Sequence, residues 1–220
     1  MGEGHFKEFE EEYLETMYEF YEKNPELSVR TGDIAKALGV SPASVTEMVQ
    51  RLARNGFVNY EKYRGSSLTE VGLLRGRAMK RRHRIIESFL TDALHFQGDV
   101  HETACILEHA VNDDLELTFA KILNYPEANP DGKPIPMFLK TDDTNISDTD
   151  MLFSAATLEV GQKGEVVAFL LSKSEGDAIA ELGVSIGSIM NKVTTDTWSI
   201  GDSELKMAAK LGIQILLRKC

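Results

Sequence analysis

The chain has 220 residues, of which 42% are apolar and 27% charged, and this predicts a globular protein of one or two domains with a sizeable core. No run approaches the roughly 18 apolar residues that cross a bilayer, and the acidic N-terminus lacks a signal-peptide pattern, so we expect a cytoplasmic protein without a membrane partner. Because Cys105 and Cys220 lie far apart in the sequence, we expect no disulfide framework. The net charge of −11 argues against nucleic acid as a partner, but residues 25–84 hold 12 basic and 5 acidic residues, a local balance of +7 that suits either a DNA-binding face or a solvated helix face.

The first part of the chain predicts a helix-turn-helix. Residues 6–23 carry apolar side chains at helical spacing. A short helix follows, with Thr31 as its expected N-cap and Gly39 as its stop. Ser41 and Pro42 then have the residue types expected for the N-cap and first position of a second short helix. Two short helices joined by GVS have the layout of a helix-turn-helix.

A β-hairpin and further helices are predicted next. The β-rich stretch VNYEKY, a turn at residues 64–66 and a return strand predict a wing. Residues 70–96 predict one long helix, on which His83 and Glu87 are four positions apart and share a face. Two more helices are expected, one over HETACILEH and one over DDLELTFAKILNY.

The character of the sequence changes after residue 125. Four of the six prolines lie in YPEANPDGKPIP, and residues 126–150 therefore predict a linker. Residues 153–220 contain short β-like runs punctuated by glycine, which favours a small β-barrel. The predicted fold class is mainly α with a small β domain.

The stretch HETACILEH concentrates side chains that bind metals. On a helix, one face would present His101, Cys105, Glu108 and His109. A second stripe, about 110° away around the same helix, is apolar and supplies the packing face. Its members are Val100, Ala104, Leu107 and Val111. An ordinary polar helix face remains an alternative to a metal site at this point, because one helix cannot complete a coordination shell.

Five segments, in this order, resemble one known family. They are EEYLETMYEF, the helix-turn-helix and wing ending in YEKYRGSSLT, RRHRIIESFL, HETACILEH and NPDGKPIP. The chain is similar over essentially its full length to the diphtheria toxin repressor family of iron- and manganese-dependent transcriptional regulators. The resemblance implies a winged helix-turn-helix domain over residues 1–72, a helical metal-binding and dimerisation domain over 73–140, a linker over 141–152 and an SH3-like domain over 153–220.

The resemblance also implies two metal sites. One would use Glu12, Cys105, Glu108 and His109, with Glu15 as a further ligand of the manganese-responsive type. Iron-responsive members usually have methionine where Glu12 stands. The second site would use His83, Glu87 and His101. In some members the C-terminal domain adds ligands, but AFLLSKSEGD offers no convincing counterpart.

The donor types favour a first-row divalent metal. Imidazole, carboxylate and one thiolate suit an ion of borderline softness, whereas Mg²⁺ or Ca²⁺ would prefer oxygen alone. The thiolate of Cys105 favours Fe²⁺, while Glu12 and Glu15 favour Mn²⁺. We take Fe²⁺ as the expected cofactor and Mn²⁺ as the alternative. Zn²⁺, Ni²⁺ or Co²⁺ would also bind such a site in vitro, since affinity rises along the first-row series towards Cu²⁺.

Operator DNA and a second copy of the chain are the expected partners. A homodimer would present two recognition helices to half-sites about one helical turn apart, and bound metal would fix their spacing. The recognition helix would present Ser41, Ala43, Ser44, Thr46, Glu47 and Gln50 to the major groove. Phosphate contacts are expected from Arg30, Lys36 and Arg64. Glu47 stands where iron-responsive members carry glutamine, so the resemblance leaves the operator sequence open.

Two other classes of function compete with this hypothesis. A metal-dependent hydrolase would need an open coordination position, a general base and a substrate cleft. The sequence shows no residues for these roles beyond the metal ligands themselves. We therefore predict that the protein has no catalytic residues and is not an enzyme. A DNA-binding protein that ignores metal is the second alternative. Metal-titrated DNA binding separates all three.

Overall fold

In the computed structural model, residues 3–138 and 152–220 are described, and they form two compact units. The first unit covers residues 1–83 and the second covers residues 84–220, so the division falls inside one continuous helix. Most of the predicted linker at 141–152 lies outside the described residues, and the predicted domain boundaries remain predictions.

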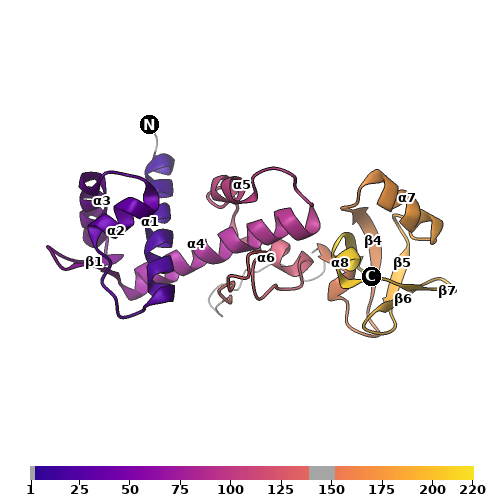
Figure 1. Ribbon diagram of the computed structural model, residues 1–220. Helices are drawn as coiled ribbons and strands as arrows, with labels where there is room; N and C mark the ends of the chain where they lie inside the picture. Colours follow the sequence, from indigo (N-terminus) through magenta and orange to yellow (C-terminus); the bar gives the residue numbers. More distant parts are fainter. Residues whose placement is uncertain (1–2, 139–151) are drawn as a thin grey trace. The chain divides into compact units, whose positions relative to one another are not determined.

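The first unit is a winged helix-turn-helix, as predicted (Figure 1). Its elements are α1 (Glu3–Lys23), α2 (Thr31–Leu38), α3 (Pro42–Arg54), β1 (Val58–Glu61), β2 (Gly65–Leu68) and most of α4 (Glu70–Ser88). Leu14 and Met17 of α1, Ile34 of α2, and Val45 and Leu52 of α3 are completely or almost completely buried in one core. Burial of these side chains holds the three helices together.

Local signals place the ends of α2 and α3. Gly39 has a φ of 66° at the C-cap of α2, and the Ser41 hydroxyl accepts a hydrogen bond from the Ser44 amide at 3.1 Å, so both predicted signals are confirmed. The predicted N-cap at Thr31 is wrong. The N-cap is Arg30, which makes no side-chain cap, and Thr31 is already the first residue of α2.

The wing is an antiparallel pair in which Val58 faces Leu68 and Glu61 faces Gly65. Its turn covers residues 62–64, two positions earlier than predicted. The shift arises because Ser66 is already part of a strand: its backbone exchanges hydrogen bonds of 2.8 and 2.9 Å with Val29. This bridge ties the hairpin to the segment before α2.

Helices α1 and α4 approach each other closely within the first unit. An ideal Cβ built on Gly76 would lie 2.5 Å from the carbonyl oxygen of Leu14, so glycine is required where the two backbones meet. Lys80 lies one turn after Gly76 on α4 and Glu15 directly follows Leu14 on α1, so the close approach brings these two charged side chains into contact.

The second unit combines helices with an antiparallel sheet. After the end of α4 come a π-helical turn η1 (Phe89–Ala93), α5 (Val100–Leu107) and α6 (Asp113–Ile122). The remaining elements are β3 (Leu152–Ser154), η3 (Ala155–Thr157), β4 (Lys163–Phe169), α7 (Lys173–Glu181), β5 (Ile189–Lys192), β6 (Thr197–Ile200), β7 (Ser203–Lys206), α8 (Ala209–Ile213) and β8 (Ile215–Lys219). The strands pair in the order β3-β8-β4-β5-β6-β7, and each pair is antiparallel.

The predicted small β domain is confirmed, and α7 was missed. The core of the sheet contains the buried Trp198, Val166 and Leu217. Helix α7 begins with a capping box between Ser172 and Glu175, a sequence signal that could have revealed it. The predicted helix over residues 70–96 ends as an α-helix at Ser88 and continues only as the turn η1.

The apolar stripe predicted for α5 is confirmed. Val100, Ala104 and Leu107 of α5, and Val111 just beyond its end, pack with Ile86 and Leu90 of the segment formed by α4 and η1. This packing directs the other face of α5 away from the core. None of the described helices combines the length and apolar character needed to cross a bilayer.

Candidate metal centre and DNA-binding surface

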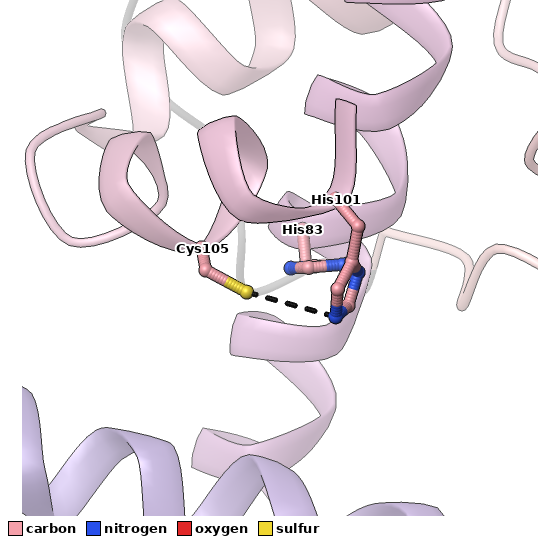
Figure 2. Close-up of side chains that lie close together, drawn as sticks. All are labelled: His83, His101 and Cys105. Atoms are coloured by element: carbon pink, nitrogen blue, oxygen red, sulfur yellow. Dashed lines mark hydrogen bonds between the residues drawn. The ribbon is translucent and has the colours of Figure 1, made fainter. Parts of the chain in front are cut away.

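Three metal-binding side chains from two helices converge in the structure. Figure 2 shows His83 of α4 together with His101 and Cys105, which lie one turn apart on α5. Each offers a donor atom, and these atoms lie within 4.8 Å of one another. The thiol sulfur of Cys105 is 3.9 Å from Nε2 of His101. The division between the units falls directly after His83, but α4 continues through it as one helix.

Glu87 lies beside this group, one turn after His83 on α4. One of its carboxylate oxygens is 3.1 Å from Nδ1 of His101, and the other accepts a hydrogen bond of 2.6 Å from the side-chain amide of Asn129. The side-chain oxygen Oδ1 of Asn129 accepts a hydrogen bond from the backbone amide of Lys133 at 2.8 Å. Both oxygens of the buried carboxylate are therefore held in place, as is typical of groups that orient metal ligands.

The sequence did not identify Asn129 as part of the site. It belongs to NPDGKPIP, whose proline content predicted a linker. The described part of that segment, through Phe138, is instead a hydrogen-bonded loop whose Ile135 and Phe138 pack against the cluster containing Ile85. The signal was present, because an asparagine followed by proline, aspartate and glycine favours a tight turn.

Glu108 and His109 follow the last residue of α5 instead of lying on its helical face as predicted. The amides of Ala110 and Val111 both bond to the carbonyl oxygen of Leu107, which tightens the chain into a turn. Glu108 is only 2% exposed, and its Oε1 is 3.6 Å from Nε2 of His109. The two predicted ligands therefore lie side by side.

Helix α1 carries the other predicted ligands, Glu12 and Glu15. Glu12 is exposed. Glu15 is buried; its Oε1 accepts a hydrogen bond of 2.8 Å from Nζ of Lys80 and lies 3.9 Å from Nδ1 of His83. Lys80 also pairs with Glu19. Burial lowers the pKa of Lys80, but the two carboxylates outweigh this effect and raise the pKa above its ordinary value, so the ammonium group is charged.

The donor set fits a first-row divalent metal. It combines imidazole nitrogen, thiol sulfur and buried carboxylate oxygen, a mixture that suits a borderline ion better than Mg²⁺ or Ca²⁺. The structure groups Cys105 with His83 and His101, which the resemblance had assigned to a different site. No residue of 152–220 takes part in the compact donor groups of the described chain.

The predicted DNA-contacting residues lie on the surface of the first unit. Exposed side chains are those of Arg30, Lys36, Ser41, Ala43, Ser44, Glu47, Gln50 and Arg64. Thr46 is half-buried, and its hydroxyl donates to the carbonyl oxygen of Pro42 at 2.8 Å. Arg64 is 3.1 Å from Glu61. This surface pair adds little stability, so Arg64 can be recruited by a phosphate at small cost.

Comparison with known proteins identifies the family. Residues 5–66 match the model for the iron dependent repressor N-terminal DNA binding domain, and residues 69–137 match that for the iron dependent repressor metal binding and dimerisation domain. An uncharacterized HTH-type transcriptional regulator of Methanocaldococcus jannaschii is 39% identical over 106 residues, covering 48% of this chain and 84% of that protein. The chain belongs to the iron-dependent repressor family.

Two further relatives are a repressor and a manganese regulator by name. The diphtheria toxin repressor of Corynebacterium jeikeium is 36% identical over 128 residues, which are 57% of this chain but only 52% of that protein. The solved structure of the manganese regulator SloR is 25% identical, with a TM-score of 0.51 over 96% of this chain and 98% of that one. The predicted family and its metal-dependent transcriptional repression are confirmed, and the hydrolase alternative is not favoured.

Proposed function

We propose that this repressor responds to Fe²⁺ and represses metal-uptake genes when the metal is plentiful. The observation that carries the choice of metal is the thiol of Cys105 within the donor group of His83 and His101 (Figure 2). A thiolate is softer than a carboxylate and favours Fe²⁺ over Mn²⁺ at equal geometry. A regulator of this kind would act in the cytoplasm, where it meets its operator.

The ligands would come from helices that lie far apart in the sequence. Cys105 would join His83, Glu87 and His101 at one site, since its donor atom lies with those of the two histidines, and Glu12 and Glu15 on α1 would join Glu108 and His109 at the other. When bound, the metal supplies a cross-link between carboxylate, imidazole and thiolate groups of different helices. Asn129 would keep Glu87 oriented, since it already holds one oxygen of that carboxylate.

The DNA-binding form would be a homodimer. The matching family model describes a dimerisation domain within residues 69–137, and α5 of that region leaves Ile106 68% exposed. An apolar side chain of this exposure suits the centre of an interface with a second copy. The residues predicted for base and phosphate contact would then face two half-sites, and the metal would stabilise the spacing that fits both.

Mn²⁺ is the alternative activating metal. It is favoured by the carboxylate donors, among which Glu15 is buried beside His83 and Glu108 is buried beside His109. Oxygen donors suit Mn²⁺ better than sulfur does. The manganese regulator SloR supports the same alternative through its similarity in sequence and fold.

Metal-titrated DNA binding tests the proposal. Duplexes would be selected from a random library by the wild-type protein under anaerobic conditions, with Fe²⁺ and Mn²⁺ used in separate selections. We expect affinity to rise with either metal and to reach half-maximum at a lower concentration of free Fe²⁺. Equal affinity with and without metal would contradict the metal-dependent repressor. Activation at lower free Mn²⁺ than Fe²⁺ would replace iron with manganese.

A further inference from the structure

The turn of the wing places a tyrosine where glycine is favoured. The amide of Arg64 bonds to the carbonyl oxygen of Glu61 at 3.0 Å, which closes a four-residue turn. Of its two central residues, only Tyr63 has a positive φ, at 68°. This pattern corresponds to a type II turn, whose third position favours glycine because other L-residues are strained there.

Packing does not compensate for this strain. The side chain of Tyr63 is 91% exposed, more than any other exposed large apolar side chain of the described residues. Its ring contact is with Lys62, whose Nζ lies 5.0 Å from the ring centre. An exposed ring in a strained backbone conformation does not stabilise the fold, so folding alone does not account for a tyrosine at this position.

The hairpin beneath this ring is firmly anchored. Ser66 is buried and bridges to Val29 through two backbone hydrogen bonds. An ideal Cβ on Gly65 would lie 2.6 Å from the Val29 carbonyl oxygen, which shows how closely the two segments meet. The hairpin begins shortly after α3 ends, and its tip projects beyond the helices of the first unit (Figure 1). Tyr63 is therefore presented on a rigid support.

We propose that Tyr63 contacts DNA, with its ring packed against the wall of the minor groove beside the half-site that α3 reads. This inference rests on the proposed function. The minor groove borders the major groove and is about 6 Å wide, which admits the edge of one ring but not a two-stranded ribbon. Lys62 and Arg64 flank the ring with positive charge, and apolar side chains combined with cations are typical of minor-groove contacts.

Replacing Tyr63 with glycine separates this role from a structural one. The variant Tyr63→Gly removes the ring and relieves the strained backbone, so we expect its melting temperature to equal or exceed that of the wild type. Its affinity for the duplex that the wild type selects from a random library with Fe²⁺ should fall about tenfold, because the apolar surface of the ring is no longer buried on binding. Tyr63→Phe should keep most of the affinity, because it retains the ring.

Salt dependence and a matched control sharpen the test. Tyrosine releases no counterions, so the slope of log affinity against log salt should be unchanged in Tyr63→Gly. Tyr125 has a φ of 51° and is 50% exposed, and Tyr125→Gly should bind DNA like the wild type. Tyr63→Gly binding within twofold of the wild type would overturn the proposal. If the wild type itself shows no metal-dependent DNA binding, the proposed function is wrong, and the proposal for Tyr63 is wrong as well.

The groove is identified with inosine. Replacing a G·C pair beside the half-site with I·C removes the guanine amino group from the minor groove and leaves the major-groove edge intact. We expect the wild type to bind the I·C duplex several-fold more tightly and Tyr63→Gly to bind both duplexes equally. Equal binding of both duplexes by the wild type would overturn the assignment to the minor groove.

Discussion

The wing and the recognition helix α3 differ in their side-chain contacts from the donor region, which comprises the predicted metal ligands of α1, α4, α5 and the turn after α5, together with the residues that contact them. On α3 the side chains predicted to contact DNA are mostly exposed, and their positions follow from local features such as the Ser41 cap. In the donor region the side chains already contact one another: Glu87 is held by Asn129 and His101, and Glu15 by Lys80. We therefore expect the side chains predicted to contact DNA to be available whether or not metal is bound, whereas a metal ion would have to compete with these existing contacts for its predicted ligands.

From this difference we expect the donor region to determine how DNA binding depends on the metal concentration. A buried carboxylate that is already paired has its desolvation offset, so a metal gains only the difference between its own interactions and those it displaces. Changes on α3 should alter DNA affinity in proportion at every metal concentration. Changes among the donors should instead shift the metal concentration at which DNA binding appears.

The largest effect is expected from Glu108 and His109. Alanine at either position removes a predicted ligand, and a lost ligand or its support commonly costs 10- to 100-fold in metal affinity. We expect metal-activated DNA binding to disappear in Glu108→Ala and His109→Ala at metal concentrations that saturate the wild type. Fluorescence anisotropy of a labelled duplex with titrated Fe²⁺ measures this loss.

A neighbouring glutamate provides the control. Glu102 is exposed on α5 and is not a predicted ligand, so Glu102→Ala should respond to metal like the wild type. Because Glu108 is buried, Glu108→Gln serves as a second variant that keeps the side-chain volume. Circular dichroism of each variant checks that it is folded. A normal metal response in folded Glu108→Ala and His109→Ala would refute the assignment of both ligands.

Removing the charge of Lys80 should change metal affinity by a smaller factor, and should increase it. Its ammonium group donates to Glu15 at 2.8 Å, so it acts as a cation already bound to a predicted ligand. Lys80→Met removes that charge at similar length. We expect metal to bind about tenfold more tightly, since repulsion of about 1.4 kcal/mol is lost, while the metal-free protein loses about 3–5 kcal/mol of stability from the broken buried pair.

Isothermal titration calorimetry and thermal melting measure the two effects on Lys80→Met. The conservative variant Lys80→Arg keeps the charge and should retain wild-type metal affinity. Metal should also raise the melting temperature of Lys80→Met more than that of the wild type, because it replaces the missing cation. Unchanged metal affinity in Lys80→Met would show that Glu15 serves the ion pair with Lys80 and is not a metal ligand.

The same contrast explains what the sequence could predict. The α3 cap and the apolar stripe of α5 depend on residue types at short, regular spacings, and both were predicted correctly. Asn129 and Lys80 were missed because they meet Glu87 and Glu15 across 42 and 65 residues of chain. Neither residue type is characteristic of metal sites, and the helix packing at Gly76 that brings Lys80 to Glu15 has no periodic signal.

The smallest expected effect concerns the choice between metals. Cys105 is exposed, so its role is not to fill the core, and its sulfur lies near His101 and His83 (Figure 2). Cys105→Glu would replace the soft donor with a hard one. We expect the ratio of Fe²⁺ to Mn²⁺ activation constants to move about tenfold towards manganese, equivalent to roughly 1.4 kcal/mol.

The activation constants for both metals must be measured anaerobically, because the thiol and Fe²⁺ both oxidise in air. Cys105→Ser provides the matched comparison, since it keeps the size of the side chain but offers a hard, weakly coordinating oxygen. It should weaken Fe²⁺ activation more than Mn²⁺ activation. An unchanged metal ratio in Cys105→Glu, with DNA binding preserved, would show that the thiol does not set selectivity, and the carboxylates of Glu12 and Glu15 would then favour manganese as the activating metal.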